Sequence, residues 1–404
     1  MPATALRCRN CQTDHALEAV GVCSRCWGPL DPVYDRDRPV TREGIEAGPP
    51  SIWRYADLLP VAPPPEQRLA PGLTPLVRAD RLADEVGVGE LWLKLDTANP
   101  THSFKDRVVA VATAKAQELG LTTIACSSTG NLANAVAARA AAEGLEAAVF
   151  CPADLEPEKL TATAAYGATL YKVAGTYDDC NRVTIELSWE VDWGFVNVGL
   201  RSYYAEGSKT IGFEIAEQLG WQTPDVVVSP IASGSLYTKL NQAFTELREL
   251  GLVDGAVPRL IGGQAKGCSP VATAFETGDP VRPVRPDTIA RSLAIGSPAD
   301  GDFAVATARA TNGAVHAVAE DAVGECMALL AGTSGVFGET AAGVTLGALR
   351  AAVAAGEVGA DDRVVLLVTG DGLKTPGAVA FTYQPIEIEA DLDAVLERLQ
   401  AAAA

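Results

Sequence analysis

Long apolar runs, a surplus of basic residues and histidine pairs are all missing from this sequence of 404 residues. No stretch reaches the roughly 18 apolar residues that a membrane-spanning helix needs. Lysine and arginine number 32 against 51 acidic residues, and the net charge of −19 argues against nucleic acid or an anionic membrane as a partner. The first residues hold cysteines and Asp14 where a signal peptide would have its apolar core. We therefore expect a cytoplasmic protein.

The fold class follows from an alternation of apolar runs and helical patterns that begins at Gly72. An apolar run from Thr122 to Cys126, for example, is followed by a helical pattern from Asn131 to Glu143. Such alternation predicts parallel sheets joined by crossover helices. The chain is long for one sheet, so we expect an α/β fold with two lobes and a site between them.

Composition divides the chain into three parts. Residues 1–35 contain two cysteine pairs and form a small unit of their own, and residues 36–72 are rich in proline and read as a linker or arm. Residues 73–404 form the two-lobed body, with a smaller lobe at about 105–210 and a helix from Asp391 to the end.

The paired cysteines predict a metal site. Cys8 and Cys11 form one C-x2-C pair, Cys23 and Cys26 form a second, and eleven residues separate the pairs. Two such pairs supply four thiolates for one tetrahedral structural zinc. A metal-free unit of the same shape, or a redox pair, is the alternative. The remaining cysteines lie in apolar or helical contexts and read as buried, inert thiols.

Lys105 is the first candidate for chemistry. It lies in the segment N-P-T-H-S-F-K-D, Asn99 to Asp106, just before a helical pattern that runs from Arg107 to Gly120. A cation is poorly placed at the start of a helix, so this lysine is better read as a neutral amine. Removed from water between two lobes, it would be a competent nucleophile and base. The alternative is an ordinary solvated lysine. His102 is a second, weaker candidate beside it.

Three loops rich in small residues each follow an apolar run: residues 127–131, 229–235 and 369–372. Backbone N–H groups at helix starts bind phosphate, and small residues let them approach it closely. The second loop lacks the Lys-Ser/Thr of a Walker loop, and plain capping or a simple turn is the alternative for each. Thr369 places a hydroxyl where it can meet a heteroaromatic nitrogen, with Asp371 as its rival. One lysine with three such loops is what a phosphorylated aldehyde cofactor requires.

The motifs, taken in order, resemble threonine synthases, which are pyridoxal-phosphate enzymes of the tryptophan-synthase β-like fold. The resemblance covers essentially the whole catalytic body, and the cysteine unit is similar to a branch of that family with an N-terminal zinc ribbon. It rests on Gly72 to Leu76, Thr101 to Arg107, Ser128 to Asn131, Ala205 to Thr210 and Thr369 to Lys374.

The resemblance implies a role for each site residue. Lys105 binds pyridoxal 5′-phosphate covalently and moves protons, Asn131 meets the cofactor 3-hydroxyl oxygen, and Thr369 meets the pyridine nitrogen. The loop Ala232, Ser233, Gly234, Ser235 and Leu236 holds the cofactor phosphate. The substrate would be O-phospho-L-homoserine, which water converts to L-threonine and phosphate. The residues expected to bind the substrate are Thr101, Ser103, Ser128, Thr129, Arg201 and Lys209.

Two departures from the family pattern leave other readings open. His102 stands where many threonine synthases have glycine, and Tyr204 stands where many have arginine, with Arg201 three residues earlier. The alternatives are a related enzyme, such as a threonine or serine dehydratase or a cysteate synthase, and a zinc-ribbon binding module on an inactive scaffold. The last would need a basic face or a lost lysine. We expect a lyase that acts on a small amino-acid phosphate and forms a homodimer.

Overall fold

The computed structural model describes residues 3–35, 39–128, 130–153, 157–175, 177–382 and 384–403. Within these ranges the strands form three sheets. The largest has the order β12-β11-β10-β13-β5-β4, and all its neighbouring pairs are parallel except β4 with β5. Its strands are β4 (Leu76–Arg78), β5 (Glu90–Leu95), β10 (Val226–Pro230), β11 (Arg259–Ala265), β12 (Ala314–Val318) and β13 (Arg363–Val368).

The second sheet is fully parallel and has the order β8-β7-β6-β9. Its strands are β6 (Thr123–Ser127), β7 (Glu146–Pro152), β8 (Thr169–Val173) and β9 (Gly194–Phe195). A small antiparallel sheet, β2-β1-β3, consists of β1 (Ala3–Cys8), β2 (Asp14–His15) and β3 (Leu30–Tyr34). Cys8 ends its central strand, and the other three N-terminal cysteines lie in the segments between the strands.

Helices connect the parallel strands. The α-helices are α1 (Arg42–Glu46), α2 (Asp80–Val86), α3 (Lys105–Glu118), α4 (Asn131–Glu143), α5 (Pro157–Ala164), α6 (Tyr177–Leu187), α7 (Arg201–Glu206), α8 (Lys209–Gln218), α9 (Ser235–Glu249), α10 (Pro270–Thr277), α11 (Gly301–Ala310), α12 (Glu320–Ser334), α13 (Thr340–Ala354) and α14 (Leu392–Ala403). Short 3-10 turns are η1 (Ile52–Leu58), η2 (Asp96–Ala98), η3 (Lys266–Cys268), η4 (Arg291–Leu293), η5 (Gly372–Lys374) and η6 (Pro376–Thr382).

The large sheet is covered on both faces, as its sequence indicates. Strand β10 begins Val-Val-Val and β13 reads R-V-V-L-L-V, with almost no polar position. Val226 and Val228 pack with helices α2, α12 and α13 on one face, whereas Val227 packs with α8, α9, α10 and α11 on the other. Side chains alternate between the faces of a strand, so a near-continuous apolar run requires cover on both. The expected α/β fold with parallel-rich sheets is confirmed.

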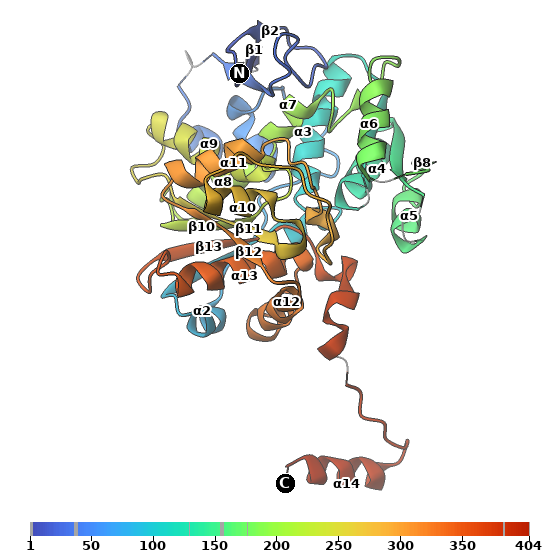
Figure 1. Ribbon diagram of the computed structural model, residues 1–404, viewed down its shortest axis with the longest axis vertical. Coiled ribbons are helices and arrows are strands. Elements are labelled where there is room, and N and C mark those ends of the chain that lie inside the picture. Colours follow the sequence, from blue (N-terminus) through green and yellow to red (C-terminus); the bar gives the residue numbers. More distant parts are fainter. Residues whose placement is uncertain are drawn as a thin grey trace.

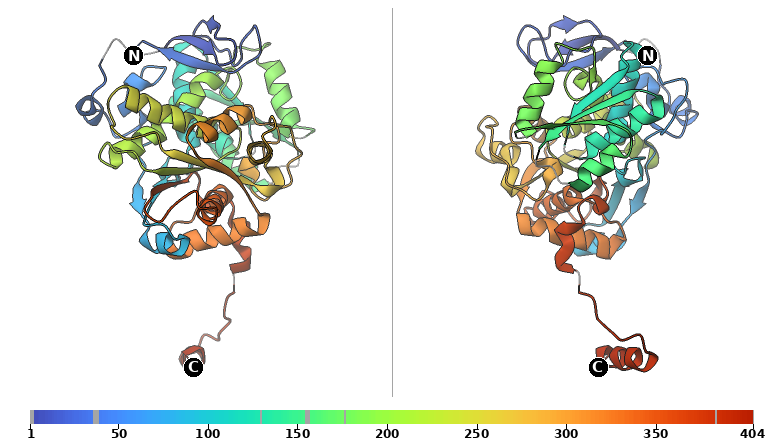
Figure 2. Two further views of the ribbon diagram at one scale, coloured as in Figure 1. Left: turned by 60° about the vertical axis from the view of Figure 1, so that its left-hand side comes forward. Right: turned by 90° about the vertical axis from the view of Figure 1, so that its right-hand side faces the viewer.

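The cysteine-bearing sheet packs on the smaller parallel lobe. Leu6 and Leu30 of the small sheet share a hydrophobic core with Val108 of α3 and with Tyr203 of α7. Figure 2 shows this unit above the strands and helices of the second sheet. The N-terminal unit is therefore packed against α3 and α7 and does not stand apart from the rest of the protein.

The segment after Lys105 is fixed by a buried ionic cluster around Arg107, whose side chain is fully buried. Arg107 donates to both oxygens of Asp96, at 2.7 and 2.8 Å, and to both oxygens of Glu214. Lys94 adds a second cation, with its Nζ 2.6 Å from Glu214 Oε2. Thr74 binds both Asp96 and Arg107. Arg107 also donates to the Thr210 hydroxyl at 3.1 Å, so three of the family-like motifs meet at one cluster, which sets the start of α3 against α8.

The two ends of the described chain lie far apart (Figure 1). The N-terminal sheet is at one end of the molecule, and α14 lies beyond the other, connected through an extended segment. Helix α14 confirms the predicted C-terminal helix, and its side chains Leu392, Leu396 and Leu399 are exposed. Among the residues that the structure describes, no helix has the length and apolar character required to cross a membrane.

Candidate active site

Three neighbouring strands of the large sheet deliver the predicted site segments to one edge. Strands β10, β13 and β5 are adjacent and parallel. The loop 232–236 follows β10, Thr369 follows β13, and the segment that contains Lys105 follows β5. Parallel strands end at the same edge, which is where open α/β sheets bind ligands. The sequence order alone could not show that these strands are neighbours.

The Lys105 segment is joined directly to the turn after β13. The Phe104 N–H donates to the Thr369 carbonyl at 2.9 Å, and the Asp371 N–H donates to the His102 carbonyl at 3.1 Å. His102 has a φ of 60°, in the left-handed region that favours glycine. This backbone geometry is the physical reason why a glycine suits this position. The His102 side chain is exposed and lies 3.3 Å from the Thr97 carbonyl, so it takes no part in the site.

Lys105 is a partly buried amine with a neutral partner. Its Nζ donates to the Tyr204 hydroxyl at 2.9 Å, and it lies 4.4 Å from the centre of the Phe104 ring. Burial lowers the pKa of Lys105 to about 8, and the attraction of Glu339 offsets only part of this effect. Burial raises the pKa of Tyr204, which therefore stays protonated near neutral pH. Lys105 therefore loses its proton more readily than an ordinary lysine, and its neutral form is the nucleophile.

Two hydroxyls of the lysine segment differ in their surroundings. The Thr101 hydroxyl and N–H both bind the carboxylate of Asp106, at 3.0 and 2.8 Å. The Ser103 hydroxyl is fully buried and has no hydrogen-bond partner in the described part of the chain. Buried hydroxyls are normally satisfied. Ser103 is therefore available to a ligand, whereas Thr101 holds the turn through Asp106.

Asn131 begins α4 and is held by two side chains that sequence reasoning missed. Its amide donates to both carboxylate oxygens of Glu339 at 3.0 Å, and its oxygen accepts from Lys374 Nζ at 2.7 Å. Burial raises the pKa of Glu339 and lowers the pKa of Lys374. Lys374 belongs to a motif that carried the family resemblance, which is the one sequence signal for it. Glu339 and Tyr204 follow no local pattern that assigns them to the site.

Ser128 and Thr129 were also predicted to bind substrate. Ser128 is buried, and its hydroxyl accepts from the N–H groups of Gly130 and Ala133, at 3.2 and 3.1 Å. This is the capping geometry that the sequence left open as an alternative. Thr129 lies outside the described residues.

The loop from Ala232 to Leu236 leads into α9. Gly234 has a φ of 92°, and a Cβ at this position would lie 2.8 Å from the Asp300 carbonyl oxygen, so only glycine fits. Helix α9 begins at Ser235 without a side-chain hydrogen bond from its N-cap residue. The Ser235 N–H donates to the Ser233 hydroxyl at 3.4 Å, and Gly234 has no side chain that could cap the helix. N–H groups at such a helix start can bind phosphate.

Arg201 begins α7, one turn before Tyr204. Its guanidinium forms an ion pair with Asp300, and its side chain is 21% exposed. Asp300 is in turn tied to the loop before α9, because its N–H donates to the Ser233 carbonyl at 2.8 Å. The structure thus brings Arg201 to the loop that was predicted to hold the cofactor phosphate.

Lys209 lies elsewhere. Its side chain is fully buried, and its Nζ pairs with Glu206 at 2.6 Å and with Glu246 at 3.0 Å. Both carboxylates are internal, so this ammonium serves the packing of α8 against α9. The spacing Glu206-x-x-Lys209 was a sequence signal for an ion pair within consecutive helical turns. Lys209 is not included in the substrate site proposed below.

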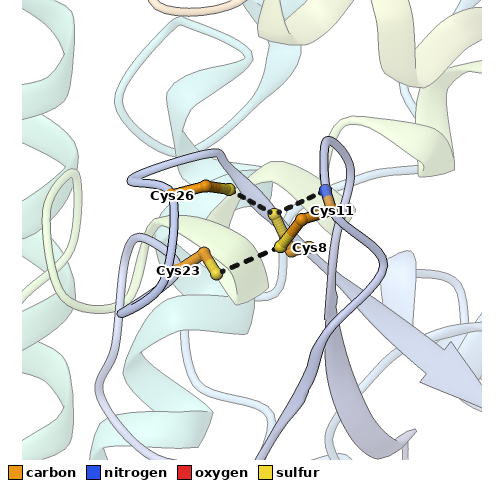
Figure 3. Close-up of side chains that lie close together, drawn as sticks. All are labelled: Cys8, Cys11, Cys23 and Cys26. Atoms are coloured by element: carbon orange, nitrogen blue, oxygen red, sulfur yellow. Dashed lines mark hydrogen bonds between the residues drawn. The ribbon is translucent and has the colours of Figure 1, made fainter.

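The four N-terminal cysteines converge, as Figure 3 shows. The sulfur atoms of Cys8, Cys11, Cys23 and Cys26 all lie within 4.8 Å of one another. Cys8 and Cys26 are 3.4 Å apart, and Cys11 and Cys23 are 3.6 Å apart. Zinc–sulfur bonds of about 2.3 Å in a tetrahedron place the sulfurs about 3.8 Å apart, so the set fits one zinc ion. The two pairs also share a turn geometry, with Gln12 and Trp27 both at a φ of 60°.

The site as a whole fits a phosphorylated pyridine aldehyde. Lys105 provides an amine whose pKa is lowered to about 8, Ser103 provides an unpartnered buried hydroxyl, and the start of α9 provides N–H groups. Thr369, which directly follows β13, is buried. An amine, a helix start and a hydroxyl at one edge of the sheet match the aldehyde, the phosphate and the ring nitrogen of such a molecule.

Known proteins of the same fold carry this chemistry. A family model for pyridoxal-phosphate dependent enzymes matches residues 68–370. The solved diaminopropionate ammonia lyase of Escherichia coli is similar with a TM-score of 0.66 at 17% identity, and the match covers 85% of this chain and 92% of that one. Maize serine racemase is similar with a TM-score of 0.63 at 19% identity, over 82% and 92% of the two chains. These structural likenesses show the fold.

Similar proteins with a curated name identify the branch of the family to which the chain belongs. The threonine synthase of Methanosarcina acetivorans is 34% identical over 400 residues, which cover 98% of this chain and 98% of that protein. The threonine synthase of Methanocaldococcus jannaschii is 33% identical over 401 residues, which cover 97% and 98%. Such identity over nearly the full length of both chains includes the cysteine unit. The chain therefore belongs to the pyridoxal-phosphate dependent enzymes and, among them, to the threonine synthases.

Proposed function

We propose that this protein converts O-phospho-L-homoserine and water to L-threonine and phosphate. The observation that carries the proposal is the identity to threonine synthases over essentially the whole chain. It is supported by the placement of Lys105, Thr369 and the loop before α9 at one edge of the large sheet.

The cofactor would be held by the segments that meet at this edge. Lys105 would bind its aldehyde carbon, and Thr369 would meet the ring nitrogen. The Asn131 amide would exchange a bond to Glu339 for one to the 3-hydroxyl oxygen. The N–H groups of residues 232–236 would hold its phosphate. When bound, pyridoxal phosphate supplies an electron-withdrawing ring that stabilises negative charge on the carbons of the substrate.

The reaction needs one base that acts at two carbons of the substrate. Lys105 Nζ would take the proton from the α carbon and then one from the β carbon, and phosphate would leave from the γ carbon. Protons would return to the γ carbon and to the α carbon, and water would add its hydroxide at the β carbon while its remaining proton passes to the base. The Tyr204 hydroxyl, which accepts from Lys105, would orient Nζ during these transfers. The lowered pKa of Lys105 places its proton exchange close to neutral pH.

The phosphate of the substrate would lie near Arg201. This guanidinium is partly exposed and is held beside the loop before α9. A planar guanidinium binds phosphate through two parallel hydrogen bonds. The free Ser103 hydroxyl would donate to the substrate as well, while Thr101 and Ser128 keep the surrounding turns in place.

Parallel assay of phosphate and threonine tests the reaction. Purified protein should release both from O-phospho-L-homoserine in equal amounts and should show little activity on free homoserine, because hydroxide is a poor leaving group. Phosphoserine with sulfite and free threonine serve as competing substrates. Faster turnover of either one would favour a cysteate synthase or a dehydratase instead.

The cofactor-binding residues have a separate test. Thr369→Asp should favour a protonated ring nitrogen and shift the absorbance of the bound cofactor. Gly234→Asp should weaken cofactor binding strongly, because the new side chain collides with the Asp300 backbone. Unchanged absorbance and unchanged affinity in both variants would refute this assignment.

We also propose that Cys8, Cys11, Cys23 and Cys26 bind one structural zinc ion. The sulfur spacing supports it, and His15 Nε2 lies 3.3 Å from Cys23 Sγ, where it can donate to a bound thiolate. Elemental analysis of protein prepared without chelator should find about one zinc per chain. No metal, together with freely titratable thiols, would indicate a metal-free unit.

The division of the chain into residues 1–35, 36–72 and 73–404, with a smaller lobe at about 105–210, is kept as a proposal. The second sheet falls within the proposed smaller lobe, since its strands span residues 123–195. The homodimer and the cytoplasmic location remain predictions.

A further inference from the structure

We propose that Arg9, within the cysteine unit, is a positioning residue of the substrate site and controls the affinity of Arg201 for phosphate. Arg9 lies in the first C-x2-C pair, far in sequence from the rest of the site. Arg9 and Arg201 nevertheless bind the same carboxylate, that of Asp300. The inference rests on the proposed function, because that function assigns Arg201 to the phosphate of the substrate.

Asp300 joins the two arginines. Its Oδ1 accepts from Arg9 Nη1 at 3.1 Å, and its Oδ2 accepts from Arg201 Nη2. The Asp300 side chain is only 4% exposed, so the carboxylate is shielded from bulk water. Its backbone is fixed by the bond from its N–H to Ser233, in the loop before α9. One buried carboxylate thus connects the cysteine unit, α7 and the proposed cofactor-phosphate loop.

Arg9 is held in place by two further contacts. Its guanidinium lies 3.6 Å from the centre of the Phe303 ring, on the helix that follows Asp300. Its Nε lies 3.6 Å from Asp31 of β3. The side chain is 20% exposed, much less than that of Arg7 two residues earlier. Arg9 therefore points into the body of the protein, between the small sheet and α11.

These residues surround a small pocket that is rich in charge. Its lining includes Arg9, Asp31, Arg201, Ser235, Lys239 and Asp300. Ser235 is the first residue of α9, so the pocket reaches the helix start assigned to the cofactor phosphate. Arg201 and Ser235 therefore line the pocket and also belong to the proposed active site.

The charge balance gives Arg9 its effect. With Arg9 present, one carboxylate is shared between two guanidinium groups, which leaves Arg201 with positive charge to offer to a phosphate. Without Arg9, Asp300 would pair with Arg201 alone and neutralise it. Because Asp300 is shielded from water, this competition is only weakly screened by salt. Arg9 would thus favour phosphate binding without touching the substrate.

Inorganic phosphate binding to the cofactor-loaded protein tests the inference independently of turnover. We expect Arg9→Met to weaken phosphate binding, measured by calorimetry, by about five- to tenfold, the size expected for coupled neighbouring charges. The KM for O-phospho-L-homoserine should rise by a similar factor while kcat stays within about twofold. Arg9→Lys, which keeps the charge, should recover most of the affinity.

Arg7→Met is the matched control. Arg7 lies on β1, two residues before Arg9, and pairs with Asp14 at 2.7 Å, but both side chains are about half exposed. This variant should bind phosphate as the wild type does. A second variant outside the cysteine unit, Phe303→Leu, removes the ring below Arg9 and should weaken phosphate binding by about two- to threefold.

The outcomes separate the inference from the function. Wild-type phosphate affinity in Arg9→Met, or an equal loss in Arg9→Met, Arg9→Lys and Arg7→Met, would overturn the positioning role. If Arg9→Met does not fold, wild-type affinity in Phe303→Leu would do the same. A wild-type protein that binds phosphate but makes no threonine from O-phospho-L-homoserine would instead refute the proposed function and leave the Arg9 effect on phosphate measurable.

Discussion

Lys105 and Lys239 are both withdrawn from bulk water, and their surroundings change their pKa values in opposite directions. Lys105 finds only the hydroxyl of Tyr204, and burial lowers its pKa to about 8. Lys239 is 3% exposed and pairs with Asp31 at 2.9 Å and with Glu206 at 2.5 Å. Although its burial acts in the opposite sense, the attraction of these carboxylates raises the pKa of Lys239 above its ordinary value.

The difference shows what distinguishes a reactive lysine from a structural one. Withdrawal from water disfavours the charged form in both cases, and the presence or absence of a carboxylate partner decides the outcome. Lys94 and Lys209 are also fully buried and paired with at least one carboxylate. For Lys94, burial lowers the pKa in spite of the attraction of Glu214, and the nearby Arg107 adds to this effect. Its Nζ is therefore distinguished from that of Lys105 by its ion pair and not by the direction of its pKa shift. Lys105 has no carboxylate within ion-pair distance among the described residues. Of these four lysines, Lys105 is the one whose amine is not held in an ion pair.

The largest effect is expected from removing the reactive lysine. Lys105→Ala should lower turnover by at least about a thousandfold, because the same amine binds the cofactor and moves both protons. The fold should persist, since no carboxylate loses its partner. Steady-state kinetics and a thermal melt check both points. A fully active Lys105→Ala protein would end this account of the site.

Removing the paired Lys239 should lower the stability of the protein, whereas removing Lys105 should lower its activity. Lys239→Met should reduce the free energy of unfolding by about 3–5 kcal/mol, because Glu206 and Asp31 would keep charges with fewer partners. Denaturant titration measures this loss. The exposed Lys266 provides a matched control, and Lys266→Met should change the free energy by less than about 0.5 kcal/mol. Equal effects of the two substitutions would show that the buried pairs stabilise nothing.

The surroundings of Arg201 are intermediate between those of Lys105, which has no carboxylate partner, and those of Lys239, which has two. Arg201 is partly exposed and is paired with one carboxylate, that of Asp300. Arg201→Ala should raise the KM for O-phospho-L-homoserine by about ten- to a hundredfold, the value of one charge-assisted contact to phosphate. Cofactor affinity should change much less. If Arg201→Ala matched the wild type in KM, the substrate assignment would pass to another cation or to another substrate.

The sequence predicted the parts of the site that are local. The segment around Lys105, the small-residue loops, Thr369 and the two cysteine pairs each appear as short patterns, and helix α4 has the predicted bounds of Asn131 and Glu143. Helix α3 begins at Lys105, two residues earlier than predicted, because a 3-10-like turn at Phe104 leads directly into it.

The long-range partners could not be predicted. Lys105 and Tyr204 are 99 residues apart, and Asn131 and Glu339 are 208 residues apart. These contacts depend on which strands are neighbours in each sheet and on how α7 and α13 pack, and no local pattern encodes either. Lys209 was predicted to bind the substrate because it lies in a motif of the family. A motif gives the order of residues in the sequence, but it does not show that Glu206 and Glu246 surround this ammonium in the fold.

A smaller effect is expected from pH. Only the neutral amine binds the cofactor aldehyde, and with a pKa of about 8 the neutral fraction of Lys105 rises with pH. The rate of cofactor loading should therefore increase by about tenfold between pH 7 and pH 9 and level off above. Absorbance of the bound cofactor follows the loading. The control is free Nα-acetyl-lysine, whose side-chain amine has the pKa of an ordinary lysine. Its rate of reaction with the cofactor should still be rising at pH 9.

The comparison of lysines is tested most directly by mapping where the cofactor attaches. Protein loaded with pyridoxal phosphate is reduced with borohydride, which fixes the bond between cofactor and lysine, and the peptides are then identified by mass spectrometry. The account predicts one modified site, at Lys105, and none at Lys94, Lys209 or Lys239. Modification of one of those paired lysines instead, or of no lysine, would contradict it.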